Sequence, residues 1–391
     1  MKRILFINHG STFGGSGVAC LKIVDSIDKK NYDVIVYCAA DYPDIADALE
    51  ERRIHVIRAF HSPVSFMHYS GNDRSMLSPS FFHNCIKILC DSTAISKVIK
   101  NIKPDIVAVN SMTLCWIGPI AKRYGVNTVC FHRETYAKGL FGLRSYLLKR
   151  VMDQYFDRIA FISKYDMEQT QLKKSKGVLI YDSVKIEKYQ TITQMEARKE
   201  LGLSNDYFYV LYLGGTSLLK GADTILKAID LCENINLRCI FLGGDKLKHN
   251  SEILSYEQRI IQKAFKEMKR AEQIVLVPTS KEIEKWYAAC NLVVFPSRDA
   301  HQALPIYEAG AAKRLMLISD FPNTQEFLRN MENGLVFCPN DADALADKIL
   351  WVFRNRDSGD VEKMVSRNQE MTIRSHSDEH FAFMIKELFN L

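Results

Sequence analysis

The residues that could hold a charged ligand lie in two loops of the second half of the chain. Lys220 stands directly before Gly221 at the expected start of a helix, where a cation is unfavourable for the helix dipole. A lysine in that place is explained if it neutralises a bound phosphate; the alternative is a solvated surface lysine. Glu308 follows Pro305, which suits the first position of a helix. We therefore expect Glu308 in the first turn, either as a helix-start acid or as an acceptor for both hydroxyls of a ribose.

Backbone groups of the second loop would complete an anion site. The first N–H groups of a helix have no partner inside it, so those around Ala303 and Leu304 could hold a diphosphate. Together with Lys220 and Glu308, these groups would form a cradle for a nucleoside diphosphate.

A glycine-rich loop, NHGSTFGGSGVA, follows the first expected strand. Gly14, Gly15 and Gly17 can bring backbone N–H groups close to an anion. Counted from Gly15, the dinucleotide pattern G-x-G-x-x-G fails, because its third position is Cys20. Asp41, after the second strand, could still bind a ribose. An NAD-dependent oxidoreductase and a turn without a ligand both remain open.

These loops belong to a repeated α/β pattern. Short β-branched runs alternate with longer amphipathic stretches, in two successive sets of about six strands. Continuous apolar strands separated by helices predict parallel sheets covered on both faces. We expect an α/β protein of two Rossmann-like, doubly wound domains facing across a cleft, with ligands at the carboxyl ends of the strands.

The domain boundaries follow from the weakest patterning, which lies around residues 188–206. We expect one domain over residues 1–190 and a second over residues 191–372. Residues 373–391 read as an amphipathic helix with no strand after it, which could pack back on the first domain.

Composition limits the class of protein. A chain of 391 residues is too long for one compact core. Its 52 Lys and Arg against 46 Asp and Glu give a net charge of +6, which favours anionic partners modestly and does not indicate nucleic acid. The ten cysteines form no CxxC pair, so neither disulfides nor a metal site are expected. No run approaches the ~18 apolar residues of a membrane span, so we expect a cytoplasmic protein, at most peripheral at the inner face of the membrane.

Residues 140–158 combine apolar and basic side chains. Apolar residues recur at helical spacing at Leu140, Leu143, Leu147, Val151 and Tyr155. Basic residues lie between them at Arg144, Lys149, Arg150 and Arg158. The pattern predicts either a core-facing helix with a solvated basic face or a peripheral membrane contact.

Several segments, in order along nearly the whole chain, resemble the GT-B glycosyltransferases of family 4, which are retaining and use nucleotide sugars. FGGSGVACLKIVDSI is similar to the family's Gly-Gly loop and helix, and LYLGGTSLLKGADTILKAI resembles its v-G-R-x-x-x-x-K-G-x-d segment. RIAFISKYDMEQT and VLIYDSVKIEKY resemble its ad-vi-avS strand and its i-x-N-G-V-D-x-x-x-F segment, with Asp182 and Ser183 in place of Asn-Gly. The stretch from VPTSKEIEKW to MENGLVF resembles its donor-site core.

The resemblance implies roles residue by residue. Lys220 falls on the diphosphate-binding lysine and Glu308 on the second glutamate of the E-x7-E motif, which binds the ribose. Gly14 and Gly15 fall on the loop that approaches the donor phosphate. His132 takes the place of a histidine that contacts the donor sugar, with a satisfied structural histidine as the alternative.

The resemblance also suggests acceptor contacts and shows one departure from the motif. Arg133 and Glu134 follow the expected sugar-binding histidine and are candidates for contacts with the acceptor substrate. Ala300 stands where the family has the first glutamate of E-x7-E. Asp299 or His301 could take over the role of that carboxylate.

A second departure is Gly215, which stands in place of the family's phosphate-binding arginine. Thr216, Ser217 and the distant Arg298 are possible stand-ins. The two departures could mean an altered donor preference, weakened catalysis or a catalytically silent protein that binds nucleotide sugars.

The activity that the resemblance implies is retaining transfer of a sugar from a UDP- or GDP-linked donor, without a cofactor or metal. The acceptor would be a glycan or a lipid-linked hydroxyl bound by the first domain, in surface-polysaccharide or lipid-linked glycan synthesis. His132, Lys220 and Asp299 would be the catalytic residues. Lys220 and helix N–H groups would stabilise charge on the departing diphosphate, while domain closure excludes water.

Overall fold

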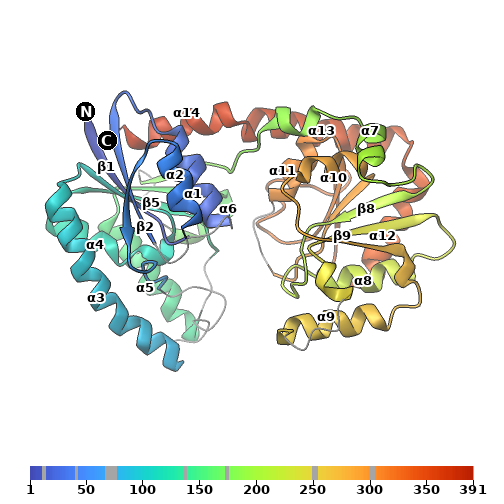
Figure 1. Cartoon of the computed structure of the whole chain (residues 1–391), viewed down its shortest axis with the longest axis horizontal. Coiled ribbons are helices and arrows are strands. Elements are labelled where there is room, and N and C mark those ends of the chain that lie inside the picture. Colours follow the sequence, from blue (N-terminus) through green and yellow to red (C-terminus); the bar gives the residue numbers. More distant parts are fainter. Residues whose placement is uncertain are drawn as a thin grey trace. The chain divides into compact units, whose positions relative to one another are not determined.

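The computed structural model describes residues 1–10, 15–39, 43–66, 77–135, 139–171, 176–248, 254–299 and 304–390. The chain divides into two compact units, one of Met1–Tyr181 with Phe381–Leu391 and the other of Asp182–His380 (Figure 1). The sequence had suggested boundaries at residues 190 and 372. Each unit is an α/β domain built on its own parallel sheet, so the predicted fold class is confirmed.

The first unit contains a seven-stranded sheet in the order β3-β2-β1-β4-β5-β6-β7. All of its neighbouring strands pair in parallel. The strands are β1 (Lys2–Ile7), β2 (Tyr32–Ala39), β3 (His55–Ala59), β4 (Ile106–Val109), β5 (Asn127–His132), β6 (Arg158–Phe161) and β7 (Gly177–Leu179). The chain starts near the middle of the sheet and builds outward to both edges, which is the doubly wound topology of Rossmann folds.

Helices cover both faces of this sheet. One face is covered by α1 (Gly15–Ser26), α2 (Asp44–Glu51) and α14 (Asp378–Phe389). The other face is covered by α3 (Pro79–Ile102), α4 (Ile117–Arg123) and α5 (Leu143–Tyr155). In β1, Ile4 and Phe6 enter the first core whereas Leu5 and Ile7 enter the second, because successive side chains of a strand point to opposite faces. This double burial explains the unbroken apolar strands of the sequence.

The C-terminal helix completes the core of the first unit. Phe381, Ile385, Leu388 and Phe389 of α14 are buried in the cluster that contains β1 and β2. The hydroxyl of Tyr32 donates to the carbonyl oxygen of Phe389 at 2.7 Å. The chain therefore returns to its first domain at its end.

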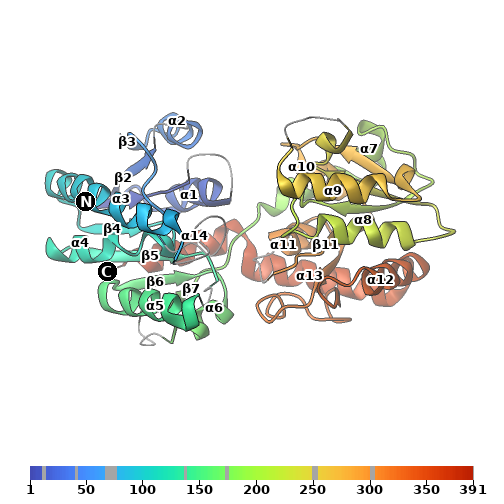
Figure 2. The same ribbon diagram turned by 90° about the horizontal axis from the view of Figure 1, so that it is seen from below.

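The second unit contains a six-stranded parallel sheet in the order β10-β9-β8-β11-β12-β13. Its strands are β8 (Phe208–Tyr212), β9 (Leu237–Leu242), β10 (Ile274–Val277), β11 (Leu292–Phe295), β12 (Leu315–Ser319) and β13 (Leu335–Phe337). Its main helices are α7 (Gln194–Glu200), α8 (Ala222–Leu231), α9 (Tyr256–Lys266), α10 (Ile283–Ala289), α11 (Leu304–Ala311), α12 (Ala342–Asn355) and α13 (Gly359–His376). Figure 2 shows α8 and α9 lying next to each other in this unit.

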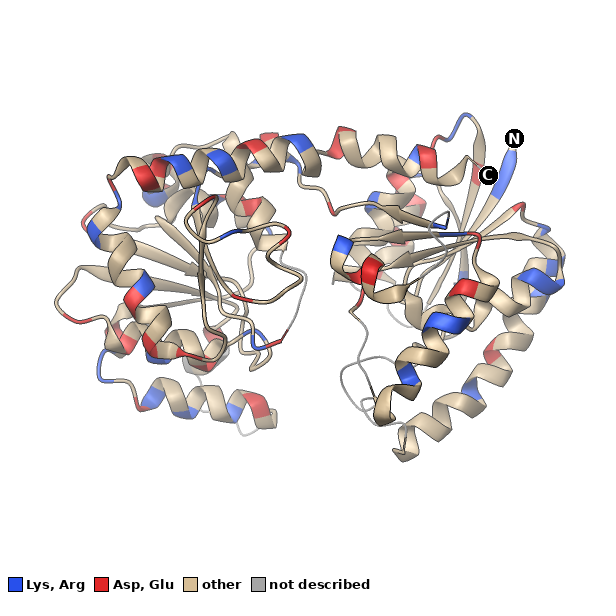
Figure 3. Ribbon diagram, turned by 180° about the vertical axis from the view of Figure 1, so that it is seen from behind, with Lys and Arg blue, Asp and Glu red and all other residues tan. Residues whose placement is uncertain are grey.

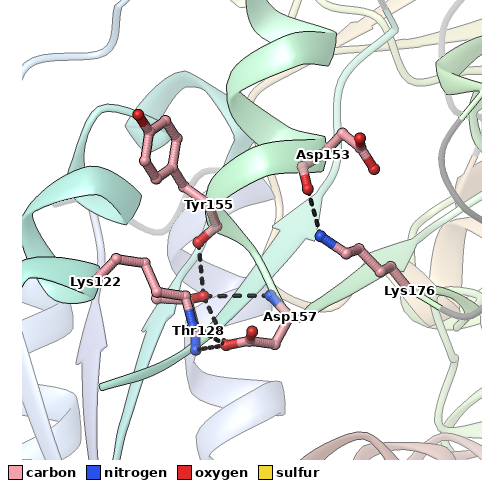
Figure 4. Close-up of polar contacts among 6 residues, drawn as sticks. All are labelled: Lys122, Thr128, Asp153, Tyr155, Asp157 and Lys176. Carbon is pink, nitrogen blue, oxygen red and sulfur yellow. Dashed lines mark hydrogen bonds and ion pairs between the residues drawn. The ribbon is translucent and has the colours of Figure 1, made fainter. Parts of the chain in front are cut away.

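A polar cluster anchors the turn between α5 and β6 (Figure 4). The carboxylate of Asp157 accepts hydrogen bonds from the backbone N–H of Thr128 at 2.8 Å and from the Lys122 ammonium at 2.5 Å. The Thr128 hydroxyl donates to the carbonyl oxygen of Tyr155 at 2.8 Å. This cluster lies at the amino edge of the sheet, because Thr128 is the second residue of β5 and Asp157 directly precedes β6, and it ties the starts of these two strands together.

The charged residues are distributed over both units. Figure 3 shows both Lys or Arg and Asp or Glu on the helices of each unit. Within the described ranges, no helix is both long enough and apolar enough to cross a lipid bilayer.

Candidate functional site

The loop between β8 and α8 lies at the carboxyl edge of the second sheet and passes very close to the loop after β11. Gly221 has a φ of +73°, and a Cβ atom on it would lie 1.8 Å from the carbonyl oxygen of Pro296. The backbone N–H of Arg298 donates to the carbonyl oxygen of Leu219 at 2.8 Å. Only glycine fits at position 221, and its small size lets the two loops dock, which brings the preceding Lys220 beside the chain after β11.

Lys220 is partly buried, and burial lowers the pKa of its ammonium. Within the part of the chain that the structure describes, it makes no hydrogen bond or ion pair. Gly215 and Thr216 precede it in the same loop; Gly215 has a φ of +56° and its N–H donates to the carbonyl oxygen of Leu242 at 3.2 Å. A cation that is partly desolvated without a counter-charge favours an anionic ligand, which would compensate its lost hydration.

Arg298 lies next to this lysine loop. Its guanidinium pairs with Oδ2 of Asp223, which is buried in the first turn of α8. The other oxygen of Asp223 and the Nε of Arg298 are buried and make no hydrogen bond among the described residues. Arg298 thus lies on a loop that is hydrogen-bonded to the residue before Lys220, and Asp223 shares its positive charge.

The start of α11 differs from the sequence prediction. The helix begins at Leu304, Pro305 is its second residue, and its first turn contains no acid. Glu308 therefore lies in the second turn, and the prediction of a first-turn acid is wrong because the helix starts one residue earlier than expected. Since the dipole acts on charges in the first turn, helix-end stabilisation does not explain this glutamate.

Two tyrosines hold the carboxylate of Glu308. The hydroxyl of Tyr189 donates to Oε1 at 2.6 Å and that of Tyr287 donates to Oε2 at 2.7 Å. Burial, followed by the charge of Glu308, raises the pKa of both hydroxyls, so they remain protonated donors at neutral pH. Sequence reasoning missed both tyrosines. The available signal was Tyr189, which stands where the related family segment ends in Phe.

An asparagine directly follows each of two central strands in the first unit. Asn8 follows β1 and Asn110 follows β4, and both are fully buried. The side-chain amide of Asn110 donates to Oδ1 of Asn8 at 2.9 Å and to the carbonyl oxygen of Ser16 at 2.8 Å. These bonds tie the start of α1, including Gly15, to the sheet. The signal in the sequence was a polar residue directly after each apolar strand.

His132 ends β5 and is completely buried. Its ring lies 4.8 Å from that of Phe161. Burial lowers the pKa of the imidazole to about 3, so the neutral form is present at physiological pH. Only the neutral imidazole agrees with this environment. It can donate or accept a hydrogen bond but adds no positive charge.

The two acceptor candidates follow His132. Glu134 accepts a hydrogen bond from the hydroxyl of Ser111 at 2.5 Å and one from the backbone N–H of Met112 at 3.3 Å. Its carboxylate is thereby held at the start of a short 3-10 helix, Met112–Leu114. Arg133 is partly buried.

The remaining candidates lie at the loop before α11. Asp299 is exposed, and its carbonyl oxygen accepts a hydrogen bond from the hydroxyl of Ser297 at 2.7 Å. Leu304 is 39% exposed as the first residue of α11. The other candidates fall outside the described residues, namely Gly14, Asp41, Ala300, His301 and Ala303. The structure thus places Lys220 and Arg298 on adjoining loops, with Glu308 on the helix that follows the second loop.

Comparison with protein families identifies both halves of the chain. Residues 13–187 match the family described as Glycosyltransferase Family 4, and residues 193–371 match Glycosyl transferases group 1. The two matches together cover most of the sequence, in the order expected for a GT-B protein. The chain belongs to the family-4-like GT-B glycosyltransferases.

Individual relatives of this glycosyltransferase are distant. It is 23% identical over 163 residues to the uncharacterized glycosyltransferase MJ1607 of Methanocaldococcus jannaschii, an alignment that covers 40% of each chain. It is 26% identical over 180 residues to D-inositol 3-phosphate glycosyltransferase 1 of Catenulispora acidiphila, covering 44% of this chain and 41% of that protein. The alignments thus span less than half the length of these curated relatives.

Solved structures share the whole fold. The Anabaena protein Alr3699/HepE in complex with UDP superposes with a TM-score of 0.76 at 16% identity, covering 98% of both chains. Its complex with UDP-glucose superposes with a TM-score of 0.74 at 15% identity, again over 98% of both chains. At such low identity the similarity establishes the fold.

Proposed function

We propose that this glycosyltransferase moves a sugar from a nucleoside diphosphate to a hydroxyl acceptor with retention of configuration. The observation that carries the proposal is Lys220, a partly desolvated ammonium without a counter-ion among the described residues, held by Gly221 against the loop of Arg298. Two cations on adjoining loops suit a diphosphate, whose oxygens carry more than one negative charge. Glu308 suits the ribose, because each carboxylate oxygen has more than one lone pair and can accept a further hydrogen bond.

In the proposed reaction, the bond between the anomeric carbon and the diphosphate oxygen breaks, and the acceptor oxygen bonds to the same face of the sugar. The acceptor proton passes to the departing phosphate oxygen. Lys220 stabilises the charge that develops on the leaving group, and Arg298 adds to this field. His132 is the candidate for a hydrogen bond to a sugar hydroxyl in its neutral form; because it is completely buried, this contact requires the chain around it to move. Asp299 is the candidate for the role of the motif's first glutamate, since Ala300 has no polar side chain.

The donor base is proposed to be uracil or guanine, and no cofactor or metal is required. UDP is the better first probe, because the similar Anabaena protein was crystallised with UDP and with UDP-glucose. The proposed setting is surface-polysaccharide or lipid-linked glycan synthesis, by analogy with the family.

The test is calorimetric titration of the full chain with UDP, GDP and NAD. We expect UDP or GDP to bind and NAD not to bind. The K220Q variant should lose about tenfold or more in affinity, corresponding to one charge-assisted contact. The control is K263Q, because Lys263 is an exposed lysine on α9. Absence of nucleoside diphosphate binding, or equal binding by K220Q, would overturn the proposal. Binding of UDP-glucose without any turnover would point instead to a silent nucleotide-sugar-binding protein.

We also propose that the acceptor is lipid-linked and that the first unit contacts the membrane surface. The buried residues of α3, Asp91, Ile95 and Ile99, all lie in its second half. On its first half, apolar side chains at helical spacing are exposed, namely Phe82 (57%), Ile86 (66%) and Leu89 (69%). This uncovered stripe exceeds the scattered apolar exposure that is normal for a surface.

The turn before α5 adds to this apolar surface. Leu140, Phe141, Leu143 and Tyr146 are exposed there. The sequence had placed Arg144 on a basic face and Leu147, Val151 and Tyr155 toward the core. Instead, Arg144, Leu148 and Met152 are the buried residues of α5, while Leu147, Val151 and Tyr155 pack only partly buried against the core. The buried face of α5 is therefore shifted by one residue from the predicted one, because the helix turns Leu148 and Met152 into the core and leaves Leu147 and Val151 at its margin.

Charge on this surface favours an anionic membrane. Lys87 lies on the apolar half of α3, and Lys149 and Arg150 follow the apolar turn on α5. Residues 77–90 and 139–152 contain no acid. Because α3 and α5 lead into parallel strands, their starts lie at the carboxyl edge of the sheet, where His132 ends β5. The proposed membrane contact is thus at the same edge as the proposed acceptor site.

Liposome co-sedimentation tests the membrane contact. We expect binding to vesicles containing phosphatidylglycerol and much weaker binding to phosphatidylcholine alone. Both F141S/L143S and K149Q/R150Q should reduce binding several-fold, whereas M195S should not, because Met195 is 69% exposed on α7 of the second unit. Equal sedimentation of all variants, or none of the wild type, would contradict the proposal.

A further inference from the structure

The carboxylate of Glu308 is held by hydroxyl groups from two separate elements. Tyr287 lies in α10, and Tyr189 lies in a 3-10 helix, Ile186–Gln190, that is distant in sequence. The two rings meet edge to face with centroids 5.5 Å apart. Tyr287 is completely buried and Tyr189 is 7% exposed, while Glu308 remains half-buried. The tyrosines therefore lie on the inner side of a carboxylate that keeps some access to solvent.

The hydroxyls fix the orientation of the carboxylate. A glutamate has three rotatable side-chain bonds, and a single contact would leave its carboxylate free to rotate. One donor on each oxygen defines the plane of the carboxylate. Because each carboxylate oxygen has more than one lone pair, a carboxylate held in this orientation can take part in hydrogen bonds with two neighbouring hydroxyl groups of a ligand. A ribose presents such a pair at its 2′ and 3′ positions.

Tyr189 also connects Glu308 to the segment through which the chain enters the second unit. This segment begins at Asp182. The backbone N–H of Val184 donates to the carbonyl oxygen of His376 at 2.8 Å, at the end of α13. Gln190 donates from its side chain to the carbonyl oxygen of Ala311 at 3.4 Å, at the end of α11. Residues 182–190 are therefore fixed to both α13 and α11, and Tyr189 is their contact with the proposed ribose-binding group.

We propose that Tyr189 and Tyr287 are positioning residues for the nucleotide ribose, and that Tyr189 couples ribose binding to the order of residues 182–190. The inference rests on the proposed function, in which Glu308 binds the ribose. It adds a contribution specific to this chain, because the related family segment ends in Phe where this chain has Tyr189. Replacing Tyr189 with phenylalanine removes only its hydroxyl group, so Y189F tests whether that hydroxyl positions Glu308.

The first experiment is a double-mutant cycle in which one change removes a protein group and the other removes the ribose hydroxyls of the ligand. The affinities of wild type, Y189F, Y287F and E308Q are measured for UDP and for 2′,3′-dideoxy-UDP. We expect the wild type to prefer UDP by about tenfold, E308Q to lose this preference, and each Tyr→Phe variant to lose most of it. Affinity for the dideoxy ligand should stay nearly constant across the series. A tyrosine with only a structural role would weaken both ligands equally.

The second experiment is hydrogen exchange with and without UDP. Peptides within residues 182–190 should exchange more slowly when UDP binds to the wild type, and this protection should be lost in Y189F. The control is Y32F, which removes a hydroxyl hydrogen bond of similar length, 2.7 Å, from the first unit. It should leave both the preference and the protection unchanged.

The outcomes separate this inference from the proposed function. If the wild type does not bind UDP, or binds both ligands equally, the ribose role of Glu308 fails and the inference fails with it. If E308Q loses the preference while Y189F and Y287F keep it, the proposed function stands and the inference is wrong. Should Y287F not fold, Y189F decides alone, since phenylalanine is the residue of the related segment.

Discussion

Gly221 and Pro296 approach so closely that a Cβ atom on the glycine would lie 1.8 Å from the proline carbonyl oxygen. No rotation of a side chain relieves this overlap, because the Cβ position is fixed by the backbone. The contact also determines where Lys220 lies, since the lysine precedes the glycine and the proline precedes the loop of Arg298. Backbone packing, supported by the hydrogen bonds of Ser297 and Arg298 to the Leu219 carbonyl oxygen, therefore positions the proposed diphosphate cation.

The first prediction concerns this contact. G221A should lower the apparent free energy of unfolding of the second unit by about 3 kcal/mol or more, because the two loops must separate. The control is G202A, since Gly202 has a φ of +65° with no atom within 4 Å of an added Cβ. That variant should cost only the left-handed backbone strain of about 1–2 kcal/mol. Urea denaturation measures the free energy of unfolding of both variants. Equal decreases in G221A and G202A would show that the clash at Pro296 is relieved.

The second prediction concerns the charge of Arg298. Asp223 is buried and accepts the guanidinium, so R298Q should leave its carboxylate with only the exposed Lys227, 4.0 Å away, as a cationic partner and destabilise the protein by roughly 2 kcal/mol. D223N keeps the shape of the side chain and removes the competing charge. We expect D223N to tighten UDP binding several-fold and R298Q to weaken it, as measured by calorimetry. Weaker binding by D223N would mean that the ion pair positions Arg298 rather than neutralising it.

The fold was predictable because parallel sheets covered on both faces have a strong sequence signal. The apolar strands and their intervening helices predicted the two-domain class. The pattern did not predict β7 (Gly177–Leu179). This strand has only three residues and is not fully buried, so it carries little periodicity. The start of α5 was missed for another reason. Glycines at 139 and 142, with φ of +45° and +93°, interrupt a continuous apolar pattern, so the helix begins at Leu143 instead of Leu140.

The proposed site was predictable only in part. Motif spacing indicated Lys220 and Glu308, which are local features of loops and helix starts. The hydrogen bond between Tyr189 and Glu308 joins residues far apart in sequence, and no local pattern of one sequence reveals such a pair. Arg298 was only one of the possible stand-ins for the missing arginine until the docking of its loop on Leu219 placed that loop beside Lys220. Contacts between loops are decided by tertiary packing rather than by local propensity.

The third prediction concerns acid stability. Burial lowers the pKa of His132 to about 3 and that of His376 to about 4. Both histidines are neutral in the folded protein, whereas in the unfolded chain they take up protons below about pH 6.5. The unfolded state then binds more protons, so stability is fully present above that pH and is lost as the pH falls towards 4.

Each histidine should contribute a slope of up to about 1.4 kcal/mol per pH unit in this window. Urea denaturation at pH 7, 6 and 5 measures the slope for wild type, H132F and H376F. In each variant the free energy of unfolding should fall less steeply with decreasing pH than in the wild type, even where its stability at pH 7 is lower. An unchanged slope in H132F would mean that its imidazole becomes protonated in the folded state.

The fourth prediction concerns the amino edge of the first sheet, away from the proposed ligand groups. Oδ2 of Asp157 accepts from both the Thr128 backbone and the Lys122 ammonium, and the Thr128 hydroxyl donates to the carbonyl oxygen of Tyr155 (Figure 4). T128V keeps the side-chain shape and leaves the Tyr155 carbonyl without its donor, so it should cost about 1–2 kcal/mol. T128S keeps the hydroxyl and should cost less than T128V.

Thermal unfolding measures the difference in stability between these variants. Their UDP affinity should remain unchanged, because this cluster lies in the first unit whereas Lys220 and Glu308 belong to the second. A loss of UDP binding in correctly folded T128V would mean that the first unit's strand register also determines nucleotide binding.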